Sequence, residues 1–286
     1  FLTGGAGADI LDGGEGNADI ARYNLSTEGV RVDLELGTGL GGEAQGDILL
    51  NIESLLGSAH DDDLFGDNFD NSLLGSGGND FLSGRAGSDR LFGGEGNDSL
   101  HGGDGQDFLF GGEGSDHLTG GLGADVINGG AGGDLVRYIL SEEGVTVNLM
   151  TNHGYGGTAE GDVYIDIESA LGSRHDDHLI GSDESNHLYG LDGDDILDGG
   201  AGHDRLFGGS GADTFIFGQG DDTAIITDFE DDVDVLDLSG FGYSDLSAAL
   251  SDMYQHGDDV RLETASGEYL VLLNVELSDM ANDILI

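Results

Sequence analysis

The chain has 286 residues, of which 56 are glycine, and carries a formal net charge of −50 at pH 7. Because its only basic side chains besides nine histidines are eight arginines, we expect neither nucleic acid nor anionic membranes as partners. Cysteine and proline are absent, which excludes disulfides and proline isomerisation, and no apolar run is long enough for a membrane span.

The first residues already contain a glycine-rich turn that ends in an acid, Gly4 to Asp9, and a second turn with one extra residue follows at 13–19. Residues 20–56 then form a spacer. In it Val30, Val32 and Leu34 alternate with polar residues, which predicts a half-buried strand. We interpret the spacer as a wider coil of the repeat structure that follows; the alternative is a flexible insertion.

From residue 62 an acid or amide recurs every nine residues, and from residue 75 on glycine-rich tetrads precede most of these residues, which gives the pattern G-G-x-G-x-D-x-U-x, where U is a large apolar residue. The acids or amides are Asp62, Asn71, Asp80, Asp89, Asp98, Asp107, Asp116, Asp125 and Asp134, and each is followed two positions later by Leu, Ile or Val. This period is typical of calcium-binding β-rolls. We therefore predict an all-β chain folded as a parallel β-roll, a solenoid of the β-helix kind.

The chain contains an internal duplication. With a shift of 115 positions, residues 19–98 align with 134–213 without a gap, and His60-Asp61-Asp62 falls on His175-Asp176-Asp177. We expect a first block at 1–138, a second block at 139–217 with its own spacer at 139–171, and a C-terminal region at 218–286. The apolar alternation of the first spacer recurs in the second, at Val145, Val147 and Leu149.

The nine-residue period ends after about residue 217. Residues 224–229 and 233–238 predict strands, 244–253 a short helix with Ser244 as its cap, and 260–263 with 269–273 a hairpin. The chain ends in the apolar Ile284-Leu285-Ile286. Because a roll exposes an open edge at its last coil, we expect this region to cap it.

The spacing explains why calcium is needed. Two repeats make one coil, so acids 18 residues apart stack about 4.8 Å from one another, and unneutralised they would repel strongly. Glycines permit positive φ, which turns main-chain carbonyls inward. Carbonyl and carboxylate oxygens suit Ca²⁺ better than Mg²⁺ or Zn²⁺. Burying one Leu in each repeat stabilises the fold by less free energy than the ordering of nine residues costs in conformational entropy. We therefore expect the metal-free chain to be largely unfolded.

These repeats resemble the repeats-in-toxin (RTX, haemolysin-type) calcium-binding repeats of bacterial secreted proteins. The resemblance implies that each Ca²⁺ lies between two stacked turns. One turn contributes its second and fourth carbonyls and its Asp, and the next contributes its first and third carbonyls and its Asp. It implies sites formed by Ser76, Gly78 and Asp80 with Gly93, Glu95 and Asp98; by Arg85, Gly87 and Asp89 with Gly102, Asp104 and Asp107; by Gly94, Gly96 and Asp98 with Gly111, Glu113 and Asp116; by Gly103, Gly105 and Asp107 with Gly120, Leu122 and Asp125; by Gly112, Gly114 and Asp116 with Gly129, Ala131 and Asp134; by Leu191, Gly193 and Asp195 with Gly208, Ser210 and Asp213; and by Gly200, Gly202 and Asp204 with Phe217, Gln219 and Asp222.

Some turns depart from the family pattern. His60 and His175 stand where glycine is expected, and the turns that end in Asn71 and Asn186 lack the glycines. Asp62 with Asp80, and Asp177 with Asp195, are therefore weaker candidate sites.

The C-terminal region, 211–239, resembles that of serralysin-like type I secreted proteins, which implies an uncleaved export signal. The start of the chain has neither Met nor a secretory signal, so we interpret it as a fragment of a longer protein.

We find no catalytic set. The sequence lacks H-E-x-x-H and G-x-S-x-G, and duplication alone explains the recurring His-Asp-Asp. Asp228, Asp231, Asp234 and Asp237 are either a further ion site or a solvated acidic edge. The leading hypothesis is a non-enzymatic calcium-binding module, secreted to the medium or cell surface, whose partners are the type I secretion machinery and an upstream domain. The alternative is an adhesin or polysaccharide-binding module with a glycan partner.

Overall fold

The structure, a computed structural model, describes residues 1–286. It divides into two compact units. Unit 1 comprises residues 1–137 and 159–167, and unit 2 comprises residues 138–158 and 168–286. The division places part of the second spacer in unit 1 and groups the C-terminal region with the second block of repeats.

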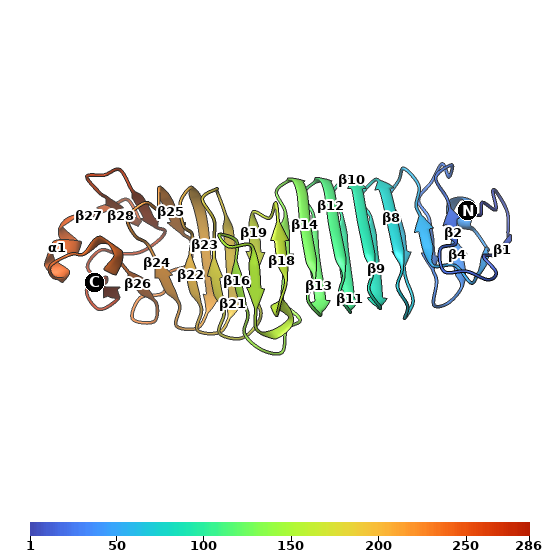
Figure 1. Cartoon of the computed structure of the whole chain (residues 1–286). Helices are drawn as coiled ribbons and strands as arrows, with labels where there is room; N and C mark the ends of the chain where they lie inside the picture. The colour runs from blue at the N-terminus through green and yellow to red at the C-terminus, as the bar shows by residue number, and fades with distance from the viewer. The chain divides into compact units, whose positions relative to one another are not determined.

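Unit 1 consists of short strands in two sheets, with successive turns of the chain alternating between them (Figure 1). One sheet has the order β1-β5-β4-β3-β7-β9-β11-β13-β15 and the other β2-β6-β8-β10-β12-β14-β18. The strands of the first are β1 Ile10–Asp12, β3 Arg31–Asp33, β4 Thr38–Leu40, β5 Ile48–Leu50, β7 Asp63–Phe65, β9 Phe81–Ala86, β11 Ser99–Asp104, β13 His117–Leu122 and β15 Leu135–Arg137. Those of the second are β2 Ile20–Arg22, β6 Ser54–Leu56, β8 Ser72–Gly77, β10 Arg90–Glu95, β12 Phe108–Gly114, β14 Val126–Gly132 and β18 Val163–Ile165.

The register in unit 1 confirms the predicted parallel roll. Leu91 of β10 lies beside Leu73 of β8 and Leu109 of β12, which is the stacking at 18 residues that the period predicts. The apolar residue of every repeat points inward and is fully buried. These residues are Leu64, Leu73, Leu82, Leu91, Leu100, Leu109, Leu118, Ile127 and Val136. The leucine ladder is therefore the core of the unit.

Unit 2 is built in the same way. One sheet has the order β19-β21-β23-β25-β29-β28-β27 and the other β17-β16-β20-β22-β24-β26-β30. The first contains β19 Ser169–Leu171, β21 His187–Asp192, β23 His203–Ser210, β25 Thr223–Ile226, β27 Met253–His256, β28 Asp259–Glu263 and β29 Tyr269–Leu272. The second contains β16 Thr146–Asn148, β17 His153–Tyr155, β20 His178–Ile180, β22 Ile196–Asp198, β24 Thr214–Ile216, β26 Val235–Asp237 and β30 Ile284–Leu285.

The spacers are ordered, but they are more than wider coils. Within unit 1, β3 pairs with β7 in parallel and β5 pairs with β1 in parallel, while β4 runs antiparallel between β3 and β5. Within unit 2, β16 pairs with β20 in parallel and with β17 antiparallel. Each spacer thus contains a backward strand that the period-2 pattern could not reveal. Val30, Val32, Val145, Val147 and Leu149 are buried as predicted.

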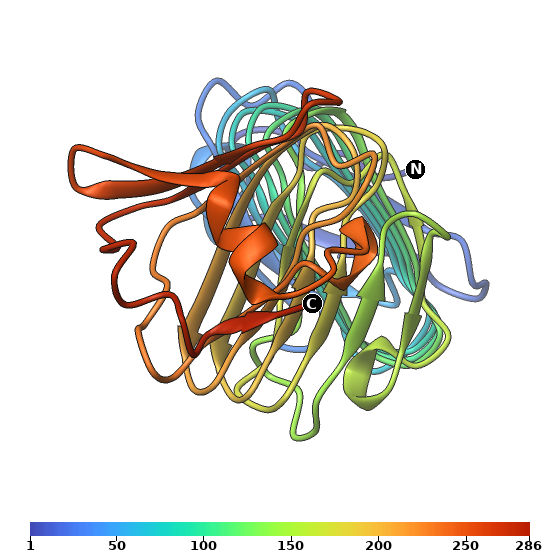
Figure 2. The ribbon, with the colours of Figure 1, turned by 90° about the vertical axis from the view of Figure 1, so that its left-hand side faces the viewer.

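The C-terminal residues of unit 2 add the last strands to both sheets. β29 joins β25 in parallel, the predicted hairpin β28–β29 is antiparallel, and β27 adds to it, while β30 pairs with β26. The helix α1, Leu246–Ser251, lies against β27 (Figure 2). Its N-cap is Asp245, whose side chain accepts from Ala248 N–H, and not the predicted Ser244.

Three 3-10 turns complete the elements: η1 Gly42–Ala44, η2 Gly157–Ala159 and η3 Ser239–Phe241. No helical segment has the length and hydropathy of a bilayer span.

Candidate metal centre

The acids of the repeats form ladders through one of their two carboxylate oxygens. Asp80 N–H donates to Asp98 Oδ1 at 2.8 Å, and Asp98 N–H donates to Asp116 Oδ1 at 2.8 Å. The same contact, always 18 residues apart, links Asp62 to Asp80, Asp89 to Asp107, Asp107 to Asp125, Asp116 to Asp134, Asp177 to Asp195 and Asp195 to Asp213. The carboxylates are therefore fixed in rows along the turns.

The other oxygen, Oδ2, is buried and has no hydrogen-bond partner. This holds for Asp80, Asp89, Asp98, Asp107, Asp116, Asp125, Asp195, Asp204 and Asp213. A buried carboxylate oxygen without a donor is costly, and nine of them in regular rows cannot be a local accident of packing. A cation beside each Oδ2 would satisfy it.

The first glycine of each turn leaves room at this oxygen. A Cβ placed on Gly93 would lie 2.1 Å from Asp98 Oδ2 and 2.6 Å from the carbonyl oxygen of Gly111 in the next turn. The corresponding Cβ-to-Oδ2 distance is 2.1 Å at Gly84, Gly111 and Gly190. The space above this glycine thus borders a carboxylate and a carbonyl from successive turns, which are two of the ligand types that Ca²⁺ prefers.

The second and fourth positions have the backbone conformation that the ligand pattern requires. Gly94 and Gly96 have φ values of 124° and 126°. Three second positions keep a positive φ without glycine: Ser76 at 91°, Arg85 at 78° and Leu191 at 94°. A side chain at such a φ is strained, so the turn geometry is maintained by the stacked neighbours and not by local preference.

Electrostatics agree with the geometry. Burial is the main cause that raises the pKa of Asp80 to about 8, of Asp89 and Asp125 to about 7 and of Asp98 to about 6. The main-chain N–H donors act in the opposite direction, and neighbouring carboxylates raise the pKa of Asp80 further. The ionised form is therefore disfavoured in these turns unless a positive charge lies beside it.

The structure brings most of the predicted ligand sets together. In the sets of Asp98 with Asp116 and of Asp195 with Asp213 the acids are in direct contact through the ladder. The third-position carbonyls already accept one hydrogen bond each, as Glu113 does from Gly96 N–H at 2.8 Å, and retain a second lone pair for an ion.

One predicted set is not assembled. Asp204 was expected to stack on Asp222, but β23 pairs with β25 so that Asp204 lies beside Ala224. The offset there is 20 residues because two extra residues precede the strand. Asp222 is exposed, and the main-chain N–H of Phe217 is bonded to Asp237. This is a correction to the site of Gly200, Gly202 and Asp204 with Phe217, Gln219 and Asp222.

The irregular turns satisfy their acids or amides without a metal. Asp62 accepts from Ser58 N–H and Oγ and from Val30 N–H, and Asp177 does the same with Ser173 and Val145. Asn71 donates through Nδ2 to the carbonyl of Glu53. Asn186 makes the same bond to Glu168 at 3.0 Å. These positions therefore end the ladders, which weakens Asp62 and Asp177 further as ligands.

Three ladder members were missed by the nonapeptide count. Asp9 N–H donates to Asp47 Oδ1, Asp125 N–H donates to Asp162 Oδ1, and Asp213 N–H donates to Asp234 Oδ1. The offsets are 38, 37 and 21 residues, so the 18-residue spacing does not identify them. The recurrence of Gly46-Asp47 as Gly161-Asp162 was the available signal for the first two.

The middle residue of the recurring His-Asp-Asp, Asp61 or Asp176, accepts a hydrogen bond from a main-chain N–H of the next turn. Asp61 Oδ1 accepts from Asn79 N–H at 2.7 Å, and Asn79 Oδ1 in turn accepts from Asn97 N–H at 2.8 Å. Asp176 begins the equivalent row with Asp194 in unit 2. The fifth positions thus form a second, exposed ladder beside the buried one.

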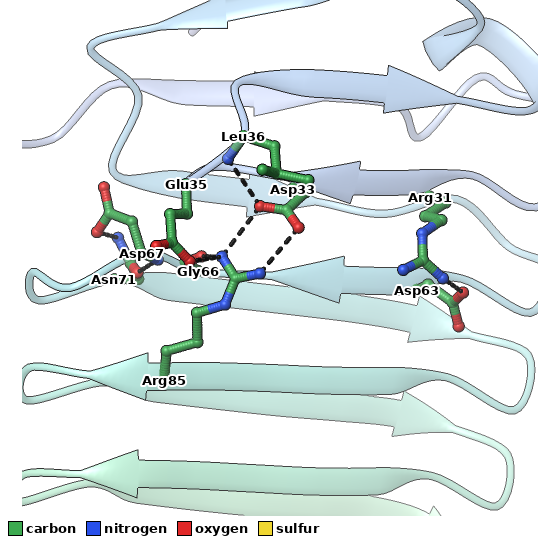
Figure 3. A network of polar contacts seen from close by, with 9 residues as sticks. All are labelled: Arg31, Asp33, Glu35, Leu36, Asp63, Gly66, Asp67, Asn71 and Arg85. Atoms are coloured by element: carbon green, nitrogen blue, oxygen red, sulfur yellow. Dashed lines mark hydrogen bonds and ion pairs between the residues drawn. The ribbon is translucent and has the colours of Figure 1, made fainter.

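An arginine side chain joins the first spacer to the repeats of unit 1. Arg85 contacts both oxygens of the buried Asp33, at 2.8 and 3.0 Å, and Glu35 at 3.1 Å, and it donates to the carbonyl of Gly66 (Figure 3). This guanidinium lowers the pKa of Asp33 against the opposing effect of burial. The contacts fasten the β3–β4 segment of the first spacer to the repeats.

Comparison with known proteins identifies the repeats. The family model described as RTX calcium-binding nonapeptide repeat (4 copies) matches residues 1–20, 56–91, 65–100, 83–118, 101–136, 171–206 and 192–224, more than half of the chain. No curated protein matches.

Two solved structures are similar at low identity. The extracellular lipase LipA from Serratia marcescens is 19% identical over 79% of this chain and 40% of its own, with a TM-score of 0.30. The AlgE6R3 subunit of the Azotobacter vinelandii mannuronan C5-epimerase is 24% identical over 60% of this chain and 78% of its own, also at 0.30. This chain thus spans 40% of the lipase's length.

Proposed function

The chain belongs to the RTX calcium-binding nonapeptide repeat family and is a Ca²⁺-binding β-roll module, and on that premise we propose that it folds on calcium binding after type I secretion. The observation that carries the proposal is the row of buried Oδ2 atoms without partners. Without cations these carboxylates oppose folding, and with Ca²⁺ beside them they join successive turns.

Export fits the same physical features. The chain has a charge of −50 and no cysteine, so while Ca²⁺ is scarce its carboxylates repel one another and no disulfide opposes that repulsion. Millimolar Ca²⁺ outside the cell would then start folding, in the range of affinity of extracellular calcium modules. We propose the type I secretion machinery as one partner and an upstream domain of the same parent chain as the other.

We further propose that the module itself is not an enzyme. The buried acids are aligned in rows by the main chain, and the recurring His-Asp-Asp contributes to a structural ladder. Its role would be to support the export and folding of the domain that it accompanies.

The folding proposal is tested by circular dichroism of the full chain. We expect little β-sheet signal in EGTA, a cooperative rise on addition of Ca²⁺, and reversal on chelation. D98N removes one shared ladder charge but keeps an acceptor for Asp80 N–H, so it should raise the Ca²⁺ midpoint several-fold. E142Q, which also replaces one carboxylate by an amide but at an exposed residue outside the ladders, is the matched control.

A β-sheet signal that persists in EGTA would overturn the proposal. The calcium-loaded sample should also be applied to a glycan array. Calcium-dependent binding of a defined glycan would favour the alternative function, an extracellular adhesin or polysaccharide-binding module.

A further inference from the structure

Unit 2 contains three carboxylates that meet outside the repeat ladders. Asp231 and Asp232 lie in the turn between β25 and β26, and Asp283 directly precedes the last strand, β30. Each offers one carboxylate oxygen, and these three oxygens lie within 4.8 Å of one another. Two segments far apart in sequence thus place three acids side by side.

The central acid of this cluster is buried and incompletely bonded. Asp283 is only 3% exposed, and its Oδ2 is buried without a hydrogen-bond partner. Asp231 and Asp232 are exposed, and no arginine forms an ion pair with any of the three. Within the cluster the main-chain N–H of Asp232 donates to the Asp283 carboxylate, and the Asp231 and Asp283 carboxyls are in hydrogen-bonding contact. Asn282 Nδ2 reaches Asp232 Oδ1 at 3.4 Å. Three like charges at this separation repel unless a cation lies between them.

The cluster is separate from the nearest ladder. That ladder ends at Asp234, whose Oδ1 accepts from Asp213 N–H at 3.0 Å and whose Oδ2 accepts from Glu230 N–H at 2.8 Å. Both oxygens of Asp234 are therefore used. The three carboxylates come from the turn before β26 and from the residue before β30. Neither segment contains a nonapeptide, so the family pattern does not include these acids.

The donor chemistry selects the ion. All three ligands are carboxylates, with none of the histidine or cysteine ligands that Zn²⁺ sites in proteins mostly use. The two exposed acids leave room for water molecules, which complete the six to eight oxygen ligands of Ca²⁺. We propose that Asp231, Asp232 and Asp283 bind one further Ca²⁺.

This ion would fasten the last strand. β30 is two residues long, and its pairing with β26 includes the bond from Leu236 N–H to the carbonyl of Asp283 at 2.7 Å. So short a strand has few contacts of its own. A cation shared between Asp283 and the turn before β26 joins the C-terminal residues to the end of the roll and makes closure of this sheet depend on calcium.

The test is a count of bound ions by native mass spectrometry of the full chain in saturating Ca²⁺. D283N should bind one ion fewer than the parent chain. D258N, which removes an exposed acid of the same C-terminal region, should bind the full number. Limited proteolysis should cleave D283N faster within residues 276–286. A full complement of ions in D283N would overturn the proposal.

A second variant covers the case in which D283N does not fold. The double variant D231N/D232N changes only exposed residues, so it should fold and still lose one ion; retention of that ion would equally overturn the proposal. D98N separates this inference from the proposed function, because it should lose ladder ions while keeping the C-terminal residues protected. If the parent chain folds without calcium, the proposed function fails whatever the count of ions.

Discussion

At the scale of the residue, the first glycine of each turn is required for space and not for backbone freedom. Gly93 has no positive φ, yet a Cβ there would lie 2.1 Å from Asp98 Oδ2. By contrast, a Cβ on Gly77, also without a positive φ, would have its nearest neighbour at 3.8 Å. Gly93 occupies the first position of its turn and Gly77 the third, so neither glycine is needed for a positive φ, but only Gly93 lies against a ladder carboxylate.

We therefore expect G93A and G77A to differ. G93A pushes the carboxylate of Asp98 out of place and should destabilise the calcium-loaded chain by about 1–3 kcal/mol, as overpacked sites do. G77A should change the free energy of unfolding by less than about 0.5 kcal/mol. Thermal unfolding in saturating Ca²⁺ measures both, and equal melting temperatures would show that the space above Gly93 is not needed.

The ladder acids show how much of the candidate site can be predicted from the sequence. The nine-residue period identified the nine ladder Asp residues whose Oδ2 is left without a partner, because each of them lies in a regular turn, but it could not identify Asp283, which lies outside the repeats. It missed Asp47, Asp162 and Asp234, since these reach the ladder across insertions. It also placed Asp222 beside Asp204, where two extra residues put Ala224 instead.

At the scale of the element, the two spacers achieve the same fold with different contacts. In the first, Arg85 binds Asp33 and Glu35. In the second, the residue equivalent to Arg85 is Gly200, whose Cβ would lie 3.7 Å from the terminal methyl of Met150. The charged contact is thus specific to the first spacer, although the duplication made the two copies look equivalent.

We expect R85G to loosen the first spacer selectively. Glycine relieves the strained φ of 78°, which offsets part of the lost contacts, so the overall calcium midpoint should change little. Amide exchange in residues 31–40 should nevertheless become about tenfold faster or more, because the Asp33 carboxylate that accepts from Leu36 N–H is no longer held by the guanidinium.

Residues 146–155 of the second spacer are the control within the same molecule. Their exchange rates should remain as in the parent chain, since Gly200 already occupies the equivalent position. Equal acceleration of both spacers would mean that R85G acts on the fold as a whole, and no acceleration in either would mean that Arg85 does not hold β3.

The spacers also mark the limit of element prediction. Alternation correctly placed Val32 and Val147 in buried strands, since burial on one face leaves a period of two. It could not show that β4 and β17 run backward. The direction of a strand depends on its pairing partner, and the turns that reverse the chain here contain Gly37 and Asn152, both at positive φ.

At the scale of the whole molecule, the raised pKa values make folding depend on pH in a direction opposite to that of most acidic proteins. An aspartate with an ordinary pKa of 3.8 in the unfolded chain has a pKa of about 6 to 8 in these turns. The folded chain therefore binds more protons over this interval. Its stability without metal is greatest at low pH and is lost as pH rises through about 6 to 8.

We accordingly predict that acid partly replaces calcium. In EGTA, the β-sheet circular dichroism of the full chain should be minimal at pH 8 and should increase as pH falls to 5.5. In Ca²⁺ the trend should reverse, with a higher calcium midpoint at pH 5.5, because protons compete for the same carboxylates. A metal-free signal that is constant or decreases on acidification would contradict the assignment of these carboxyls.

Acid reduces the net charge of −50 as well as protonating the buried ladder acids, so a salt experiment is needed to distinguish these two effects on folding. Sodium chloride at 1 M shortens the screening length to about 3 Å and weakens repulsion between exposed acids, but it screens buried pairs much less. If the ladders control folding, salt at pH 8 should not restore the β-sheet signal that acid restores. If net surface charge controls it, salt and acid should act alike, and the rows of Oδ2 atoms would not be the reason that this chain requires calcium.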